Sequence, residues 1–344
     1  LTRLILPAYL KGIAGSAFIE ANLTGTLEIP EGVTFIGDYA FWDCPFYAEV
    51  KLPSTLKRIE PGAFKDTKIE GELKLPEGLE YIGEEAFCRG TKFSGSLVLP
   101  SSLKFIGDGA FFATTFTNDL VIPQGIEMST GPWGIFSGCL FNHVEFPEGM
   151  ETIEAGMFTG NPLQGELLLP SSIKELKHDC FRGTTISSVV LPEGLRLLEK
   201  GVFADCNRLE GVIAIPERIV VIPEETFMGC SLLDGVHLHK DVVFIANGAF
   251  RNCYNMNTLV CDAVTPPVVE EGAFDGVPKD NFSIEVPAEA VSAYKMAEGW
   301  KEFKRITAYS NFVCRPATAC AINTMHEETL ILNADGPWTV SHLP

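Results

Sequence analysis

Basic residues and long apolar runs are both scarce in this sequence. The 344 residues include 26 Lys and Arg against 45 Asp and Glu, which gives a formal net charge of −19. An acidic surface repels phosphate backbones and anionic lipid headgroups, so the charge argues against nucleic acid and membrane surfaces as direct partners. No run of about 18 apolar residues is present, so the sequence predicts no membrane-spanning helix.

Motifs that carry catalytic or metal-binding chemistry are also missing. The sequence has no Gly-x-Ser-x-Gly elbow, no Walker phosphate loop, no His-Glu-x-x-His and no Cys-x-x-Cys. His178 and Cys180 stand two residues apart, which would suit a nucleophile and its base. Cys180 directly precedes a repeated phenylalanine, however, and packing is the favoured interpretation. We therefore expect no enzyme activity, no cofactor and no metal.

What the sequence does contain is one pattern repeated along most of its length. An aromatic marker recurs at steps of 22 to 25 residues, a period typical of repeat architectures. The markers are Phe18, Phe41, Phe64, Phe87, Phe111, Phe136, Phe158, Phe181, Phe203, Phe227, Phe250 and Phe274. An aliphatic residue stands five positions before nearly every marker, and the turn with Gly131 is the exception. Each unit opens on Leu-x-Leu-Pro or a close variant, as in Leu73 to Pro76.

These units cannot bury their apolar faces alone, but stacked units can cover one another. In Leu73-Lys74-Leu75 the leucines are predicted to point inward and the lysine outward, because strand side chains alternate. Proline then ends the strand, since it has no N–H for the ladder. The sequence therefore predicts a repeat solenoid with a parallel β-strand ladder and about 12 turns of ~23 residues over residues 1–278.

The repeated phrase resembles a known family. "LEIPEGVTFIGDYAF" (Leu27 to Phe41), "LKLPEGLEYIGEEAF" (Leu73 to Phe87) and "LVLPSSLKFIGDGAF" (Leu97 to Phe111) are similar to the BspA-like, treponemal-type leucine-rich repeat. The resemblance implies a right-handed leucine-rich repeat coil, mostly β and irregular. Residues 279–310 resemble the capping repeat that closes such arrays, with one strand and then a helix. We expect the apolar side of that helix to be Ala290, Ala293, Tyr294 and Met296, continued by Trp300 and Phe303.

The two ends of the chain depart from the repeat. Residues 311–344 read as strand, turn, strand, and "EETLILNADGPWTVSHLP" resembles the opening of a BACON-type β-sandwich module cut short. Cys314 and Cys320 in this tail are candidates for a disulfide. The first repeat starts at Leu4 without a cap, so we expect further residues upstream.

Two repeated columns and one histidine pair each have a structural and a functional interpretation. Five of the ten cysteines, Cys44, Cys139, Cys206, Cys230 and Cys253, stand three residues after a marker. A fixed repeat position favours buried packing thiols. His237 and His239 share a strand face, but no third metal ligand is evident. The residue after each strand proline is often acidic, as at Glu31 and Glu77, which indicates a solvated ridge or, alternatively, a cation-binding one.

The outward middle residue of each predicted strand is the most informative column. It is charged at first and then apolar at Val98, Val121, Leu168, Val190 and Ala214, with Glu145 as one interruption. A contiguous exposed apolar stripe of this length is typical of an interaction surface; the alternative is that β-branched residues simply favour strands. The irregular sixth turn also holds Trp133, a recognition anchor if it is exposed and a filler if it is buried.

The resemblance implies a function class without naming a ligand. BspA-like repeat proteins are associated with adhesion, so we expect a non-enzymatic binding scaffold, secreted or on a bacterial surface, whose signal or lipoprotein anchor lies upstream. The partner would be a protein bound through the solenoid face. The alternative is a carbohydrate-recognition accessory protein of a surface glycan system, with Trp133 and Trp42 stacking on sugar rings. The sequence sets neither the partner nor the oligomeric state.

Overall fold

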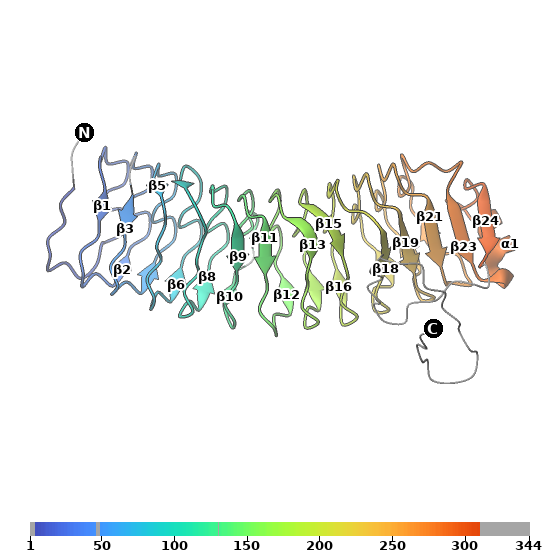
Figure 1. The fold of residues 1–344 in the computed structure, drawn as a ribbon, viewed down its shortest axis with the longest axis horizontal. Helices are drawn as coiled ribbons and strands as arrows, with labels where there is room; N and C mark the ends of the chain where they lie inside the picture. The colour runs from blue at the N-terminus through green and yellow to red at the C-terminus, as the bar shows by residue number, and fades with distance from the viewer. Residues whose placement is uncertain (1–3, 46–48, 130, 310–344) are drawn as a thin grey trace, which may run out of the picture. The chain divides into compact units, whose positions relative to one another are not determined.

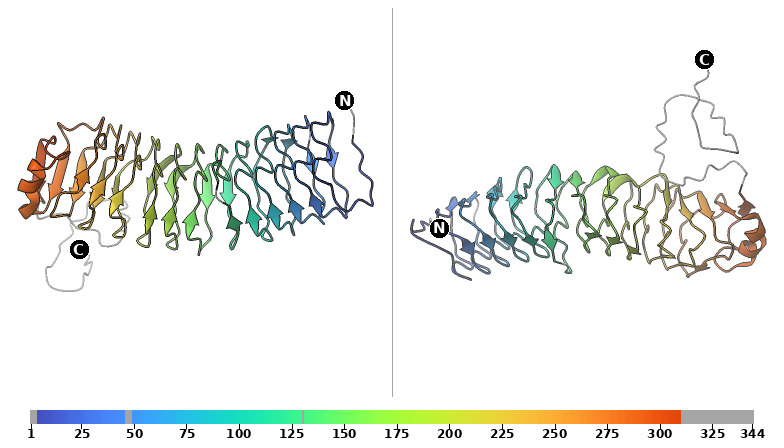
Figure 2. Two further views of the ribbon diagram at one scale, coloured as in Figure 1. Left: turned by 180° about the vertical axis from the view of Figure 1, so that it is seen from behind. Right: turned by 90° about the horizontal axis from the view of Figure 1, so that it is seen from below.

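The computed structural model describes residues 4–45, 49–129 and 131–309. The contacts divide the chain into two units, 1–310 and 311–344. The tail, with its predicted sandwich opening and its Cys314–Cys320 pairing, lies outside the described residues. The first unit is a coil of about 12 turns whose strands follow one another along its long axis (Figures 1 and 2). The predicted solenoid is therefore confirmed, while the domain boundary at 278 and 279 stays a prediction.

From the second turn onward, each turn carries a short strand on one side of the coil, and these strands form the first ladder. Its strands are β1 (Leu27–Glu28), β3 (Val50–Lys51), β5 (Glu70–Gly71), β7 (Lys92–Phe93), β9 (Asp119–Val121), β11 (His143–Glu145), β13 (Gln164–Leu167), β15 (Thr185–Val189), β17 (Val212–Ala214), β19 (Gly235–Leu238), β21 (Thr258–Cys261), β23 (Ser283–Val286) and β24 (Arg305–Ala308). They pair in parallel as β1-β3, β5-β7, β9-β11, β13-β15 and β17-β19-β21-β23-β24. Leu73 and Lys74 alternate buried and exposed as predicted, although the paired strand of that turn is β5, just before them.

A second ladder, which the sequence analysis did not predict, runs along the coil at the aliphatic column. Its strands are β2 (Phe35–Ile36), β4 (Arg58–Ile59), β6 (Tyr81–Ile82), β8 (Phe105–Ile106), β10 (Glu127–Met128), β12 (Thr152–Ile153), β14 (Glu175–Leu176), β16 (Leu197–Leu198), β18 (Val221–Ile222), β20 (Phe244–Ile245) and β22 (Val268–Val269). The pairing is parallel and in three groups, β2 to β10, β12 to β16 and β18 to β22. Figure 1 shows many of these strands beside those of the first ladder.

The core between the ladders is a set of continuous columns. Successive marker rings from Phe18 to Phe274 stack with centroids 5.1 to 5.9 Å apart and planes within 18° of parallel. Offset stacking at this distance is favourable beyond the apolar area that it buries. From Phe41 to Phe250 the markers have no exposed surface, so each turn completes the core of the next.

The last turn is closed by the predicted cap. After β23 come a 3-10 turn, η1 (Ala288–Ala290), and a short helix, α1 (Val291–Met296), and then β24 pairs with β23. The hydroxyl of Tyr294 donates to the carbonyl of Ala263 at 2.9 Å, and the indole N–H of Trp300 donates to Pro267 at 2.7 Å. These bonds satisfy the polar groups of two aromatic side chains that are buried.

One detail of the predicted cap is wrong. Ala290, Tyr294, Trp300 and Phe303 are buried, but Ala293 is exposed and Met296 is 81% exposed. Helical neighbours turn by about 100° per residue, so a helix of one and a half turns that buries Tyr294 directs the residue two positions later to the opposite side. The apolar side of α1 is therefore narrower than the sequence suggested.

Candidate functional site

The apolar stripe, defined as Val98, Val121, Leu168, Val190 and Ala214, lies on the outer face of the first ladder. Val98, Val121, Leu168 and Val190 are 54 to 69% exposed, and Ala214 is exposed too. The residue before each of them is buried, as with Leu97 and Leu120. The alternation of strand side chains thus exposes these apolar groups to solvent, while the residues beside them pack in the core.

The pairing register divides the stripe into neighbouring groups. Val98 bridges to Val121, and Val121 pairs with Glu145 on β11. Leu168 and Val190 directly follow the paired residues Leu167 and Val189 of β13 and β15. Ala214 pairs with His237 on β19. Paired strands lie about 4.8 Å apart, so the stripe is two apolar pairs separated by a carboxylate, with a smaller patch beyond them.

Trp133 lies elsewhere on the coil, in the sixth turn. Met128 and Phe136 are eight positions apart there, against five for Ile106 and Phe111, so the turn carries three extra residues before its marker. Met128 pairs with Ile106 and therefore fills the aliphatic column in the turn where the sequence analysis had found it broken at Gly131. Trp133 is 39% exposed, and among the described residues its ring contacts Phe112 and Arg89 and no member of the stripe.

Asp108 holds this enlarged turn against the preceding one. Its carboxylate accepts the backbone N–H groups of Trp133 at 3.2 Å and Gly134 at 2.9 Å, and its own N–H donates to the Ser129 hydroxyl at 2.6 Å. A Cβ on Gly131 would lie 2.2 Å from the Asp108 carboxylate, which accounts for glycine at that position. The buried carboxylate thus satisfies two loop donors.

An aromatic row, made of Trp42, Asp66, Arg89, Trp133 and Phe112, crosses several marker turns. The Trp42 indole N–H donates to the Asp66 carboxylate at 3.3 Å, and Arg89 pairs with the same carboxylate at 3.4 Å. The Arg89 guanidinium lies 5.8 Å from the Trp133 ring centre, and Phe112 meets Trp133 edge-on at 5.2 Å. The row is a half-exposed polar and aromatic surface distinct from the stripe.

The cysteine column is buried, as predicted, and it makes a hydrogen bond that the sequence did not reveal. All eight cysteines in the described residues are free and buried. The thiols of Cys44, Cys139, Cys206, Cys230 and Cys253 each donate to the carbonyl of the marker phenylalanine one turn earlier, at 2.8 to 3.2 Å. Burial raises the pKa of the Cys206 thiol to about 12, so nucleophilic chemistry is disfavoured there.

The residues that suggested catalysis or metal binding are either buried or bound to other groups of the protein. The Cys180 thiol is buried, and burial raises its pKa well above the usual value. His237 lies 3.0 Å from the Asp262 carboxylate, and His239 lies 3.0 Å from the carbonyl of Ile219. On the acidic ridge, Ser54 donates two bonds to Glu31, which lower the pKa of that carboxyl. Within the described ranges no group of three potential metal ligands is found.

Comparison with known proteins adds a sequence family and a set of related folds. The model of the family described as BspA type Leucine rich repeat region matches residues 1–118, 88–210, 132–257 and 202–287. No curated protein sequence matches the chain. Within the described residues, no helix is both long and apolar enough to cross a membrane.

Solved structures with a similar fold come from several bacteria. A leucine-rich repeat protein from Bacteroides ovatus is 22% identical over 89% of this chain and 83% of its own, with a TM-score of 0.65. The pneumococcal vaccine antigen PcpA is 18% identical over 88% and 85%, with a TM-score of 0.53. A leucine rich cell surface protein from Faecalibacterium prausnitzii is 17% identical over 90% and 86%, with a TM-score of 0.46.

Proposed function

We propose that this chain, which belongs to the BspA-type leucine-rich repeat family, is a binding scaffold that engages a protein partner through the apolar stripe. The proposal rests on the exposure of large apolar side chains at one fixed repeat position. Such side chains, exposed together on a monomer, favour an interaction surface. Stacked turns hold them in place before binding, which lowers the ordering cost of a large interface.

We place this scaffold outside the cell or on its surface, where an adhesive partner would be met. The support is the family and the net charge of −19, which keeps such a protein soluble and disfavours contact with anionic lipid. The upstream reading frame tests the location. A signal peptide or lipoprotein box there is the expected result, and a cytoplasmic coding context without either would refute it.

The stripe is tested by one charge-introducing change and a matched control. Leu168→Glu places a carboxylate in the stripe next to Val190, whereas Val268→Glu makes the same class of change on β22, where Val268 is 64% exposed. Both sites are in solvent, so both variants should fold. In binding to a panel of purified extracellular-matrix proteins, we expect Leu168→Glu to weaken binding at least tenfold, about 1.4 kcal/mol, and Val268→Glu to leave it unchanged. Equal binding by both variants would dismiss the stripe.

A second candidate function rests on the aromatic row. Half-exposed indole rings beside a paired carboxylate and guanidinium resemble a surface on which a sugar ring stacks while its hydroxyls find polar partners. A glycan array separates this candidate from the first. Loss of glycan signal in Trp133→Ala, with Leu168→Glu unaffected, would support carbohydrate recognition, whereas an array without any signal would reject it.

A further inference from the structure

The second ladder is interrupted between the sixth and seventh turns. On one side of the interruption, Glu127 and Ser129 donate to Lys104 and Ile106 of the fifth turn. On the other side, Lys174 and Lys177 of the eighth turn donate to Glu151 and Ile153. Among the described residues no backbone hydrogen bond joins β10 to β12, and the two strands belong to separate sheets. Two strand edges therefore face each other unpaired.

The missing bonds can be named from the repeat. In other turns the strand residue donates to the residue before the previous strand, as Arg58 does to Thr34, and Glu60 donates to Ile36. The equivalent bonds here would run from Thr152 to Ile126 and from Glu154 to Met128, and neither is found in the described structure. Proline does not cause this gap, in contrast to the break between β16 and β18, where Pro223 stands at the donor position.

The gap lies beside the enlarged turn that Asp108 binds. Asp108 binds Ser129, Trp133 and Gly134 of the sixth turn. The coil stays joined on its other sides, because β9 pairs with β11 and Phe136 donates to Met157. The sixth and seventh turns are therefore joined at the first ladder and at the marker column but not at the second ladder.

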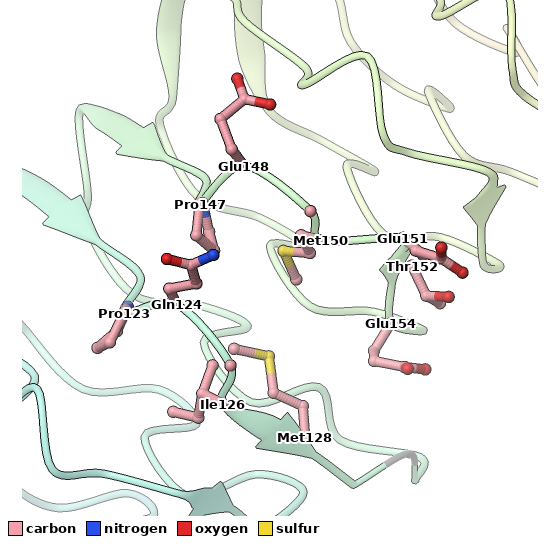
Figure 3. A pocket seen from close by; sticks show the side chains of 12 residues that line it. Pro123, Gln124, Ile126, Met128, Pro147, Glu148, Met150, Glu151, Thr152 and Glu154 are labelled. Atoms are coloured by element: carbon pink, nitrogen blue, oxygen red, sulfur yellow. The ribbon is translucent and has the colours of Figure 1, made fainter.

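A cleft of about 360 Å³ occupies this gap. Figure 3 shows Met128 on one side of it and Glu151, Thr152 and Glu154 along the other, with Met150 between them. The volume of the cleft is near the lower end of the range for small-molecule binding sites. A cleft of this size suits a short chain segment and not a folded domain.

The lining is apolar at Ile126, Met128 and Met150 and acidic at Glu148 and Glu154. One carboxylate oxygen of Glu154 is buried without a hydrogen-bond partner, and burial raises the pKa of this carboxyl despite the nearby Lys177. A cationic group would offset that cost, because a buried charge is stabilised by pairing. Methionine side chains adapt to irregular apolar surfaces.

We propose that the cleft binds an extended peptide segment of a partner protein, with alternating apolar and basic side chains. The segment adds to the unpaired strand edges through the N–H groups of Thr152 and Glu154 and the carbonyl groups of Ile126 and Met128. Its apolar side chains lie against the methionines and its basic side chains lie toward Glu148 and Glu154. Strand addition of this kind takes its affinity from main-chain bonds and its specificity from alternate side chains.

The test uses a short capped peptide of alternating valine and lysine as the probe, with calorimetry and amide hydrogen exchange. The control peptide is the same sequence with alternate backbone amides methylated, which keeps its charge and removes the main-chain donors along one edge. We expect the unmethylated peptide to bind at least tenfold tighter and to slow exchange at Thr152 and Glu154. Equal binding of the two peptides, or no binding of either, would overturn the proposal.

Two variants locate the binding, and the stripe variant separates it from the first proposal. Met128→Arg places a competing cation in the cleft, and Glu154→Gln removes one acidic group with little change of shape. Both should weaken peptide binding, with circular dichroism confirming the fold, while Leu168→Glu should bind the peptide as the unaltered protein does. Weakening by Leu168→Glu alone would assign the peptide to the stripe. Dimerisation of the unaltered protein that Met128→Arg abolishes would assign the cleft to a second copy, and either result would refute the proposal.

Discussion

The stacked phenylalanine column predicts a large loss of stability when one central ring is removed. Phe181 has no exposed surface. Its ring stacks on Phe158 at 5.8 Å and on Phe203 at 5.9 Å, and Phe146 meets it edge-on at 6.4 Å. Phe181→Ala would therefore leave a cavity that borders two other turns. Because each turn depends on its neighbours for its core, two interfaces weaken together.

The magnitude follows from burial and from the ring contacts. Truncating a buried phenylalanine to alanine costs about 3–5 kcal/mol, and with two stacked partners we expect a value near the upper end, about 4–5 kcal/mol. Phe181→Leu keeps most of the apolar volume and loses the ring stacking, so we expect about 1–2 kcal/mol. Phe35→Ala is the matched control, because Phe35 is 42% exposed on the second ladder, and we expect about 0.5 kcal/mol.

Urea unfolding followed by far-ultraviolet circular dichroism measures these differences. The midpoint should fall in the order Phe35→Ala, Phe181→Leu, Phe181→Ala, with the last lowest. If Phe181→Ala lowered the free energy of unfolding by an amount within about 1 kcal/mol of the effect of Phe35→Ala, the reasoning would be refuted. Removing a ring from a continuous interior column must destabilise the protein more than removing a surface ring.

Three further predictions concern buried polar groups. Burial raises the pKa of the folded-state Cys206 thiol to about 12, so its contribution to stability is complete below the ordinary thiol pKa and is lost as the pH rises toward 12. Cys206→Ala should make the unfolding free energy fall less between pH 8 and pH 10, and an unchanged fall would contradict this. Asp108→Ala removes the acceptor of two loop N–H groups, so we expect the free energy of unfolding to fall by about 1–3 kcal/mol and the Trp133 emission to shift to the red. Asp108→Asn keeps one acceptor oxygen, so both effects should be smaller. Glu154 has a raised pKa from burial, so Glu154→Gln should raise the urea midpoint at pH 7 and leave it nearly unchanged at pH 4; a lower midpoint at pH 7 would show that the carboxylate is stabilised there.

Most of the interior was predictable because it repeats. A residue at the same position in every unit has the same neighbours in every turn, so Phe111 and Cys206 could be assigned to buried columns without coordinates. The same reasoning predicted that Val98 and Leu168 point outward. Alternation in a paired strand decides this locally, and neither residue depends on a distant part of the chain.

The second ladder could not be read in the same way. Strands as short as Phe35–Ile36 are too brief to show the alternation that identifies a strand. Their existence depends on hydrogen bonds to the turns on either side, and those partners lie about 23 residues away in the sequence. The exposed side of α1 was also misjudged, because a helix of six residues has too few positions to define its buried face.

The sequence by itself determined the period, the marker column, the family and the outward direction of the stripe, since each of these depends on residue type at a repeated position. Only the tertiary structure decided which turns are joined. Asp108 binds the N–H groups of Trp133 and Gly134 in the sixth turn, and beside this turn β10 and β12 are unpaired. The cleft between them arises from bonds that are not formed across neighbouring turns, and a spacing in the chain cannot reveal those.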